Sequence, residues 1–179
     1  MAKKKDTWIS RKAVKIAILA VSLVVLIYFL YWKSMLFLTK PLTLNDNFTV
    51  RVPVLWDLVK YTGDYDFGKS FEGGFYSGEA LGKKASFTVN EYNFDFSHYI
   101  KTHDLGGLPF SEMRISGKEA LLFEPISSSF GNWKIYLINL DGNTLGIEIN
   151  YLNEETNAFE RYILKKSEDK IIDSITFKN

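Results

Sequence analysis

An unbroken run of apolar residues near the start of the chain limits its fold more than any other feature. Residues 13–32 read AVKIAILAVSLVVLIYFLYW, and between residues 16 and 32 the only polar side chains are those of Ser22 and two tyrosines. A helix of a globular domain needs a polar face for solvent, and this run has none. It matches the roughly 20 residues needed to cross a bilayer once Lys15 extends its ammonium to the surface. We therefore expect a membrane-spanning helix rather than the core helix of a soluble domain.

The same run is either removed as a signal peptide or kept as an anchor. The apolar part of a signal peptide is usually about 7–15 residues long and ends in small residues at the cleavage site. This run is longer and ends in YFLYWK, and Tyr28, Tyr31 and Trp32 suit the membrane interface. The chain has no cysteine, which excludes a lipoprotein. We expect an uncleaved anchor, with a cleaved signal peptide as the alternative.

Charge sets the expected orientation of the anchor. Residues 1–33 hold seven basic side chains and one acidic one, and six of the basic ones precede the apolar core of the span. By the positive-inside rule the N-terminus stays in the cytoplasm, so we expect a single-pass protein of the cell membrane with an extracytoplasmic C-terminal domain. The other 15 basic and 20 acidic side chains make the exported part mildly acidic. We therefore expect it to bind neither nucleic acid nor anionic head groups.

The chain divides into four segments. Residues 1–12 are interpreted as a basic cytoplasmic tail and residues 13–38 as the transmembrane anchor. Residues 39–47 are interpreted as a short linker, because Pro41 marks a break from helix. Residues 48–179 form the exported domain, which is long enough to bury one core without disulfides.

Alternation of apolar and polar residues dominates the exported domain. In residues 132–153 two alternating stretches flank Asp-Gly-Asn, which predicts a β-hairpin in the middle of an antiparallel sheet. Residues 112–125 predict another strand pair around a Ser-Gly-Lys turn. Adjacent strands without strict alternation with helices predict an α+β fold: an antiparallel β-sheet flanked by helices, preceded by one N-terminal transmembrane helix. Further strands are expected near residues 48–53, 85–89 and 174–177, and helices within residues 95–107 and 153–173.

Several short patterns, in this order, are similar to those of a known family. The opening FTVRVPVLW, the strand pair ISGKEALLFE, the hairpin and the closing IIDSITF resemble the family that joins the photosystem extrinsic protein PsbP, the Ran-binding protein Mog1 and bacterial envelope proteins such as DcrB. The resemblance covers most of the exported domain. It implies an antiparallel sheet flanked by helices, used in binding or accessory roles, and it carries over no ligand set. The matching positions are Phe48, Pro53, Trp56, Gly117, Ala120, Ile171 or Ile172, and Ser174.

The chain carries no recognisable catalytic or metal-binding motif. Its two histidines, His98 and His103, are five residues apart and fall on different faces of the expected helix, unlike a zinc-binding pair. Ser77 lies in FYSGEALG, which lacks the preceding glycine of a nucleophile elbow and is interpreted as a loop. The acid pairs at 154–155 and 168–169 lie near expected helix starts, where they stabilise the helix dipole. We predict no catalytic residue, no metal site, no cofactor and no enzymatic activity.

Aromatic residues gather in the glycine-rich segment that follows the first strand. Aromatic side chains on loops above a rigid sheet suit contact with proteins or saccharides. The alternative is core packing, since small cores use alternating Phe and Tyr. The predicted binding residues are Tyr65, Phe67, Phe71, Phe75, Tyr76, Tyr92 and Phe94.

These observations favour a membrane-anchored, extracytoplasmic accessory or binding protein. Its expected partners are the lipid bilayer, through the N-terminal helix, and another envelope protein, through the aromatic-rich surface. Two alternatives stay open. One is a binding module for a small ligand or glycan, and the other is an envelope hydrolase with an unrecognised site in the aromatic segment.

Overall fold

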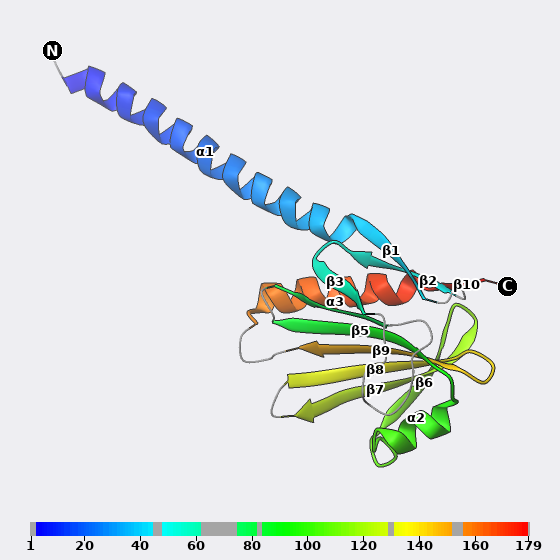
Figure 1. The fold of residues 1–179 in the computed structure, drawn as a ribbon. Helices are drawn as coiled ribbons and strands as arrows, with labels where there is room; N and C mark the ends of the chain where they lie inside the picture. Colours follow the sequence, from blue (N-terminus) through cyan, green and yellow to red (C-terminus); the bar gives the residue numbers. More distant parts are fainter. Residues whose placement is uncertain are drawn as a thin grey trace.

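The computed structural model describes residues 3–44, 48–61, 75–81, 84–128, 131–151 and 156–178, which form an α+β fold with antiparallel sheets (Figure 1). The expected fold class is confirmed. The helices are α1 (Lys3–Phe37), α2 (Phe96–Thr102) and α3 (Ala158–Asp173). The strands are β1 (Thr39–Leu44), β2 (Phe48–Pro53), β3 (Trp56–Tyr61), β4 (Phe75–Ala80), β5 (Ala85–Tyr92), β6 (Phe110–Ile115), β7 (Lys118–Ser128), β8 (Gly131–Asn139), β9 (Thr144–Tyr151) and β10 (Thr176–Phe177).

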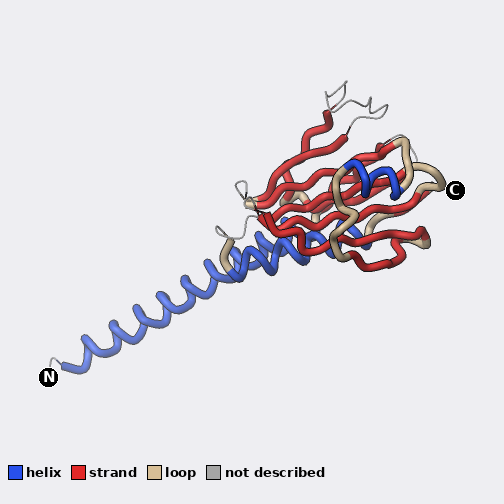
Figure 2. The backbone as a smooth tube through the Cα atoms, turned by 90° about the horizontal axis from the view of Figure 1, so that it is seen from below, coloured by secondary structure: helices blue, strands red, loops and turns tan. Residues whose placement is uncertain are grey.

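Helix α1 extends away from the rest of the molecule (Figures 1 and 2). Its segment Arg11–Phe37 is long and apolar enough to cross a membrane, and most of its apolar side chains lie exposed, whereas Leu36 near its end is buried. One such helix beside a folded domain fits a single-pass membrane protein.

A small sheet joins α1 to the domain. Its strand order is β1-β2-β10, and β1 pairs antiparallel with β2 from Thr39 opposite Pro53 to Leu44 opposite Phe48. Residues 39–44 therefore belong to the folded domain, whereas the sequence had indicated a linker over residues 39–47. Pro41 breaks the helix as expected but is tolerated in β1, because an edge strand needs no hydrogen bond from every residue.

The large sheet has the order β3-β4-β5-β9-β8-β7-β6, with every neighbouring pair antiparallel. The predicted β8–β9 hairpin is confirmed and lies near the middle of this sheet. The turn between β6 and β7 is also confirmed, with Ser116 at φ 49° and Gly117 at φ 85°, the left-handed conformations of a tight hairpin turn.

The segment FYSGEALG was expected to be a loop, but it contains β4 instead. Gly78 explains the difference: a Cβ atom at this position would lie 2.0 Å from the carbonyl oxygen of Asp57 on β3. Glycine here permits a close approach of two backbones within a strand pair.

Two cores form on opposite faces of the large sheet. Helix α3 covers one face, where Trp56 and Phe87 are fully buried and the indole N–H of Trp56 donates to the hydroxyl of Ser167. Helix α2 covers part of the other face, over Leu137 and Phe123. Because successive strand residues point to opposite faces, Tyr136 joins the α3 core while its neighbour Leu137 joins the α2 core.

Candidate functional site

A cleft of about 560 Å³ lies between α2 and the strands β6 and β7. Helix α2 occupies the end of the molecule away from α1 in both views (Figures 1 and 2), so the cleft lies far from the candidate membrane span. The lining residues are Phe96 from α2, Glu112, Met113 and Arg114 from β6, and Glu119, Ala120 and Leu121 from β7.

The wall of the cleft combines charged and apolar side chains. Glu112 and Arg114 are two residues apart on β6 and so share one face, and their Cα partners on β7 are Leu121 and Glu119. Phe96 adds an aromatic ring from α2. Two carboxylates, one guanidinium and two apolar surfaces suit a mixed polar and apolar chain segment that carries a positive charge.

Strand β6 is the last strand of the large sheet and, among the described residues, pairs with β7 alone. Phe110 at its start is 51% exposed, and most side chains along it are also exposed. An unpaired strand edge presents backbone N–H and C=O groups to which another extended chain can add. The cleft therefore adjoins an edge that can extend the sheet by one strand.

Two of the predicted binding residues, Tyr92 and Phe94, contact side chains of α2 through their rings. Tyr92 is buried, and its ring lies 5.2 Å from that of Phe94 and 4.9 Å from that of Tyr99. Phe94 is half-buried and contacts the ring of His98 at 4.6 Å. The side chain of Asp95 caps α2 by accepting a hydrogen bond from the backbone N–H of His98 at 2.9 Å. Tyr92 and Phe94 thus lie in the packing that holds one wall of the cleft.

Tyr99 connects α2 to the sheet. It is fully buried, stacks on His103 at 3.9 Å and donates a hydrogen bond from its hydroxyl to the carboxylate of Glu148 at 2.7 Å. Burial, followed by the charge of Glu148, raises the pKa of Tyr99 and raises the pKa of Tyr92 to about 12. Both phenols are therefore neutral at physiological pH.

The other predicted binding residues cannot be placed at the cleft. Tyr65, Phe67 and Phe71 lie outside the described residues. The backbone of Phe75 and Tyr76 belongs to β4, opposite Asn90 and Val89 of β5, and their side chains lie outside the described part. A binding role for these five residues stays a prediction.

A buried polar cluster around Glu168 was not predicted from the sequence. The acid pair at 168–169 was expected near a helix start, but α3 begins at Ala158, so Glu168 lies in the second half of the helix with a side chain only 4% exposed. Its carboxylate accepts hydrogen bonds from Tyr136 at 2.5 Å, from Lys134 at 3.0 Å and from Tyr151. The sequence does contain a pattern that could have predicted this burial. The spacing of Leu164, Ser167, Glu168 and Ile171 places the acid on the buried face of a helix.

The electrostatics of this cluster favour a structural role. Burial, with the charge of Glu168, raises the pKa of both Tyr136 and Tyr151. Burial acts to lower the pKa of Lys134, but the hydrogen bond to Glu124 and the charge of Glu168 outweigh it, and the pKa is raised. Both carboxylate oxygens of Glu168 are engaged by these donors, so the cluster ties α3 to β8 and β9. Within the described ranges, no group of three or more His, Asp or Glu side chains is arranged to hold a metal ion.

Comparison with solved structures relates this fold to one known architecture. The solution structure of cyanobacterial PsbP (CyanoP) from Synechocystis sp. PCC 6803 superposes with a TM-score of 0.50 at 9% identity, over 78% of this chain and 92% of that chain. The fold is PsbP-like. The resemblance expected from the sequence is confirmed at the level of the fold.

A crystal structure of a protein from Bacteroides thetaiotaomicron gives a TM-score of 0.43 at 10% identity, over 74% of this chain and 45% of that chain. No protein-family model and no curated protein sequence matches the chain.

Proposed function

We propose that this protein is a membrane-anchored, extracytoplasmic accessory protein that binds an extended segment of another envelope protein. The observation that carries the proposal is the cleft beside β6, which is an edge strand of the large sheet within the described part of the chain, at the end of the domain away from α1. An edge strand supplies main-chain hydrogen bonds, and an adjacent cleft supplies side-chain selectivity.

The PsbP-like fold and the apolar α1 fit a membrane-anchored accessory domain. The six basic side chains that precede or begin the span favour a cytoplasmic N-terminus and therefore an extracytoplasmic domain. In this orientation α1 holds the domain at the outer surface of the cell membrane, and the cleft opens towards proteins of the envelope.

The charges of the cleft indicate the chemistry of the partner segment. Glu112 and Glu119 bring two negative charges against the single positive charge of Arg114, while Phe96 and Leu121 offer apolar surface. The partner segment is therefore extended, with a basic side chain flanked by apolar ones. Tyr92 and Phe94 contribute to the binding of this segment indirectly, because they pack against α2, which forms one wall of the cleft.

Site-specific photocrosslinking of the full-length protein in native membranes tests this function. A photoreactive residue replaces Phe110 on β6, and a matched control replaces Val59, which is 54% exposed on β3 at the opposite edge of the same sheet. We expect one envelope protein to be captured from position 110 and not from position 59, and Glu112→Lys, which removes one of the two negative charges and adds a positive one, to reduce the capture severalfold. A peptide copied from the crosslinked segment should compete.

Equal capture from both edges, or capture that Glu112→Lys leaves unchanged, would refute the cleft as the binding site. A third probe at Tyr76 tests the aromatic-rich surface separately. Capture from position 76 but not from 110 would move the contact to β4 and the segment that precedes it.

A binding module for a small ligand is the second candidate, because the cleft volume falls within the range of about 300–1,000 Å³ found for ligand pockets. Chemical-shift changes at Arg114 and Glu119 on addition of small cationic ligands would favour this candidate. Changes only on addition of a peptide would favour the accessory function.

A further inference from the structure

The C-terminal end of α1, next to the folded domain, packs directly on α3. The ring of Trp32 meets that of Phe159 edge-to-face at 5.7 Å, and Leu36 is buried in the main core. Further along both helices, the ammonium of Lys170 lies 3.6 Å above the ring of Phe37. These contacts join the beginning and the end of α3 to the last turns of α1, so the two helices hold a defined relative orientation.

Aromatic side chains at the start of α3 lie exposed beside this junction. Phe159 is 41% exposed and Tyr162, one helical turn later, is 58% exposed. Arg161 and Lys165 are exposed on the same part of the helix. Scattered apolar residues on a surface need no explanation, but aromatic and basic side chains together on one helix are typical of helices that lie in a membrane interface.

The position of Trp32 relates this surface to the bilayer. Trp32 and its ring neighbours Tyr28 and Tyr31 end the apolar span, where aromatic rings settle at the level of the head groups. Since Phe159 touches Trp32, the first turns of α3 lie at about the same depth. We name this exposed surface the α3 collar; it is formed by Phe159, Arg161, Tyr162 and Lys165.

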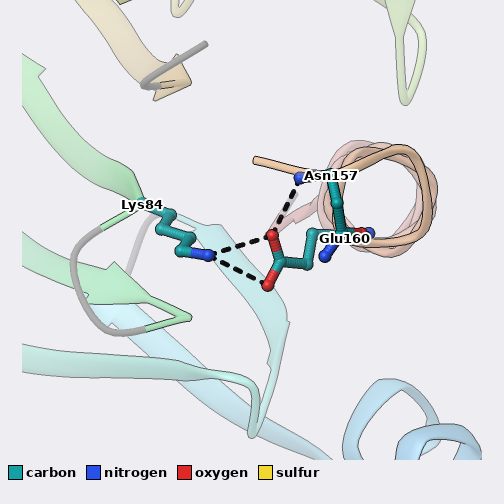
Figure 3. Close-up of polar contacts among 3 residues, drawn as sticks. All are labelled: Lys84, Asn157 and Glu160. Carbon is teal, nitrogen blue, oxygen red and sulfur yellow. Dashed lines mark hydrogen bonds and ion pairs between the residues drawn. The ribbon is translucent and has the colours of Figure 1, made fainter. Parts of the chain in front are cut away.

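The backbone beneath the collar is fixed by a polar triad (Figure 3). Asn157 caps α3 by accepting a hydrogen bond from the N–H of Glu160 at 2.9 Å, and Glu160 accepts one from the N–H of Asn157 at 3.0 Å. Lys84, just before β5, donates to both oxygens of Glu160 at 3.1 Å. The first turn of α3 is thus bound to the large sheet, and the collar projects from a rigid base.

We propose that the α3 collar binds the surface of the bilayer that α1 spans. Phe159 and Tyr162 enter the head-group layer, and Arg161 and Lys165 contact lipid phosphates. The domain as a whole is mildly acidic, so this contact is local to the collar and depends on α1 to hold it near the surface. Binding of the collar to the bilayer fixes the orientation of the domain relative to the membrane. In this orientation the cleft faces away from the membrane. This inference rests on the membrane anchoring in the proposed function.

Spin labelling in lipid nanodiscs tests the inference on the full-length chain, which has no native cysteine. Single labels are placed through Tyr162→Cys in the collar, Asp141→Cys in the β8–β9 turn, where the side chain is 81% exposed, and Ile18→Cys in the middle of α1. Discs of mixed phosphatidylcholine and phosphatidylglycerol are used. The depth of each label is measured by the ratio of its collision rate with oxygen, which partitions into the bilayer, to its collision rate with a water-soluble nickel chelate.

We expect the ratio at position 162 to exceed that at position 141 severalfold, and the ratio at position 18 to be higher still. Arg161→Glu combined with Lys165→Glu should lower the ratio at position 162 and leave position 18 unchanged. An apolar depth at position 18 with equal aqueous values at positions 162 and 141 would overturn the collar while sparing the anchor. An aqueous value at position 18 would overturn the anchoring itself, and with it the collar.

Discussion

Tyr136 of β8 donates a 2.5 Å hydrogen bond to Glu168 of α3, a carboxylate whose side chain is 4% exposed. The bond joins the middle of the large sheet to the helix that also contacts α1. Tyr151 and Lys134 complete the set of donors, so a charged group is accommodated inside the domain with both oxygens satisfied. Such a cluster stabilises one placement of α3 on the sheet only while every member is present.

Removal of this carboxylate should destabilise the domain strongly. Glu168→Ala leaves the hydroxyls of Tyr136 and Tyr151 and the ammonium of Lys134 without their shared acceptor, and we expect a loss of about 3 kcal/mol in the free energy of unfolding. Urea unfolding followed by near-UV circular dichroism in detergent micelles measures it. Asp173→Ala, on the exposed end of the same helix, should change stability by less than about 0.5 kcal/mol. Equal effects of the two substitutions on stability would contradict the role of Glu168 in holding α3 on the sheet.

Alkaline pH should unfold the domain through its buried phenols. The pKa of Tyr92 is raised to about 12, and those of Tyr99, Tyr136 and Tyr151 are also raised, with burial as the main cause. The folded state holds these protons more tightly than the unfolded state, so their stabilisation is complete below pH 10 and falls above it. The loss is about 1.4 kcal/mol per pH unit for each such group.

A pH titration monitored by phenolate absorbance and circular dichroism measures this effect. We expect the buried tyrosines to ionise together with unfolding between about pH 10 and 12. Ionisation of all tyrosines near pH 10 in a domain that keeps its circular dichroism would rule out the neutral buried phenols.

Loss of the α3 cap should weaken the base of the collar. Asn157→Ala removes the acceptor for the N–H of Glu160 and should cost about 1 kcal/mol, whereas Asn157→Asp should cost less because a carboxylate also caps. Hydrogen exchange of the first turn of α3 reports the change locally. The pKa of Glu160 is lowered by the backbone N–H of Asn157 and then by Lys84, so this contribution is present above the ordinary carboxyl pKa and disappears as the pH falls below about 4. Unchanged exchange in Asn157→Ala would argue against a fixed first turn.

A side chain at Gly78 should disrupt the pairing of β3 with β4. The Cβ atom of Gly78→Ala would lie 2.0 Å from the carbonyl oxygen of Asp57, so the two backbones must separate. We expect a loss of about 2 kcal/mol or more, the cost of a strained strand interior. Gly107→Ala is the matched control, because a Cβ there meets nothing within 4 Å. Thermal melts of both variants would settle the comparison, and similar midpoints would contradict the close approach.

Features that lie within one short stretch of the chain are predictable from its sequence, whereas features that depend on contacts between distant residues are not. The hairpin over β8 and β9 was predictable because alternation and turn residues lie within one short stretch. The strand β1 was missed, since residues 39–44 become a strand only by pairing with β2. Tyr92 and Phe94 were predicted to bind a partner, and that role stays a prediction. Their contact with α2 was not predictable, because it follows from the packing of a helix on the opposite face of the sheet from α3.

The sequence by itself determined the apolar span, the α+β class and the PsbP-like order of elements, because each follows from hydrophobic periods and turn chemistry within short windows. Only the tertiary structure decided where the cleft lies, that Glu168 is buried, and that Phe159 meets Trp32. Those relationships join residues far apart along the chain. They depend on how strands pair and helices pack, and a single sequence does not record these non-local contacts.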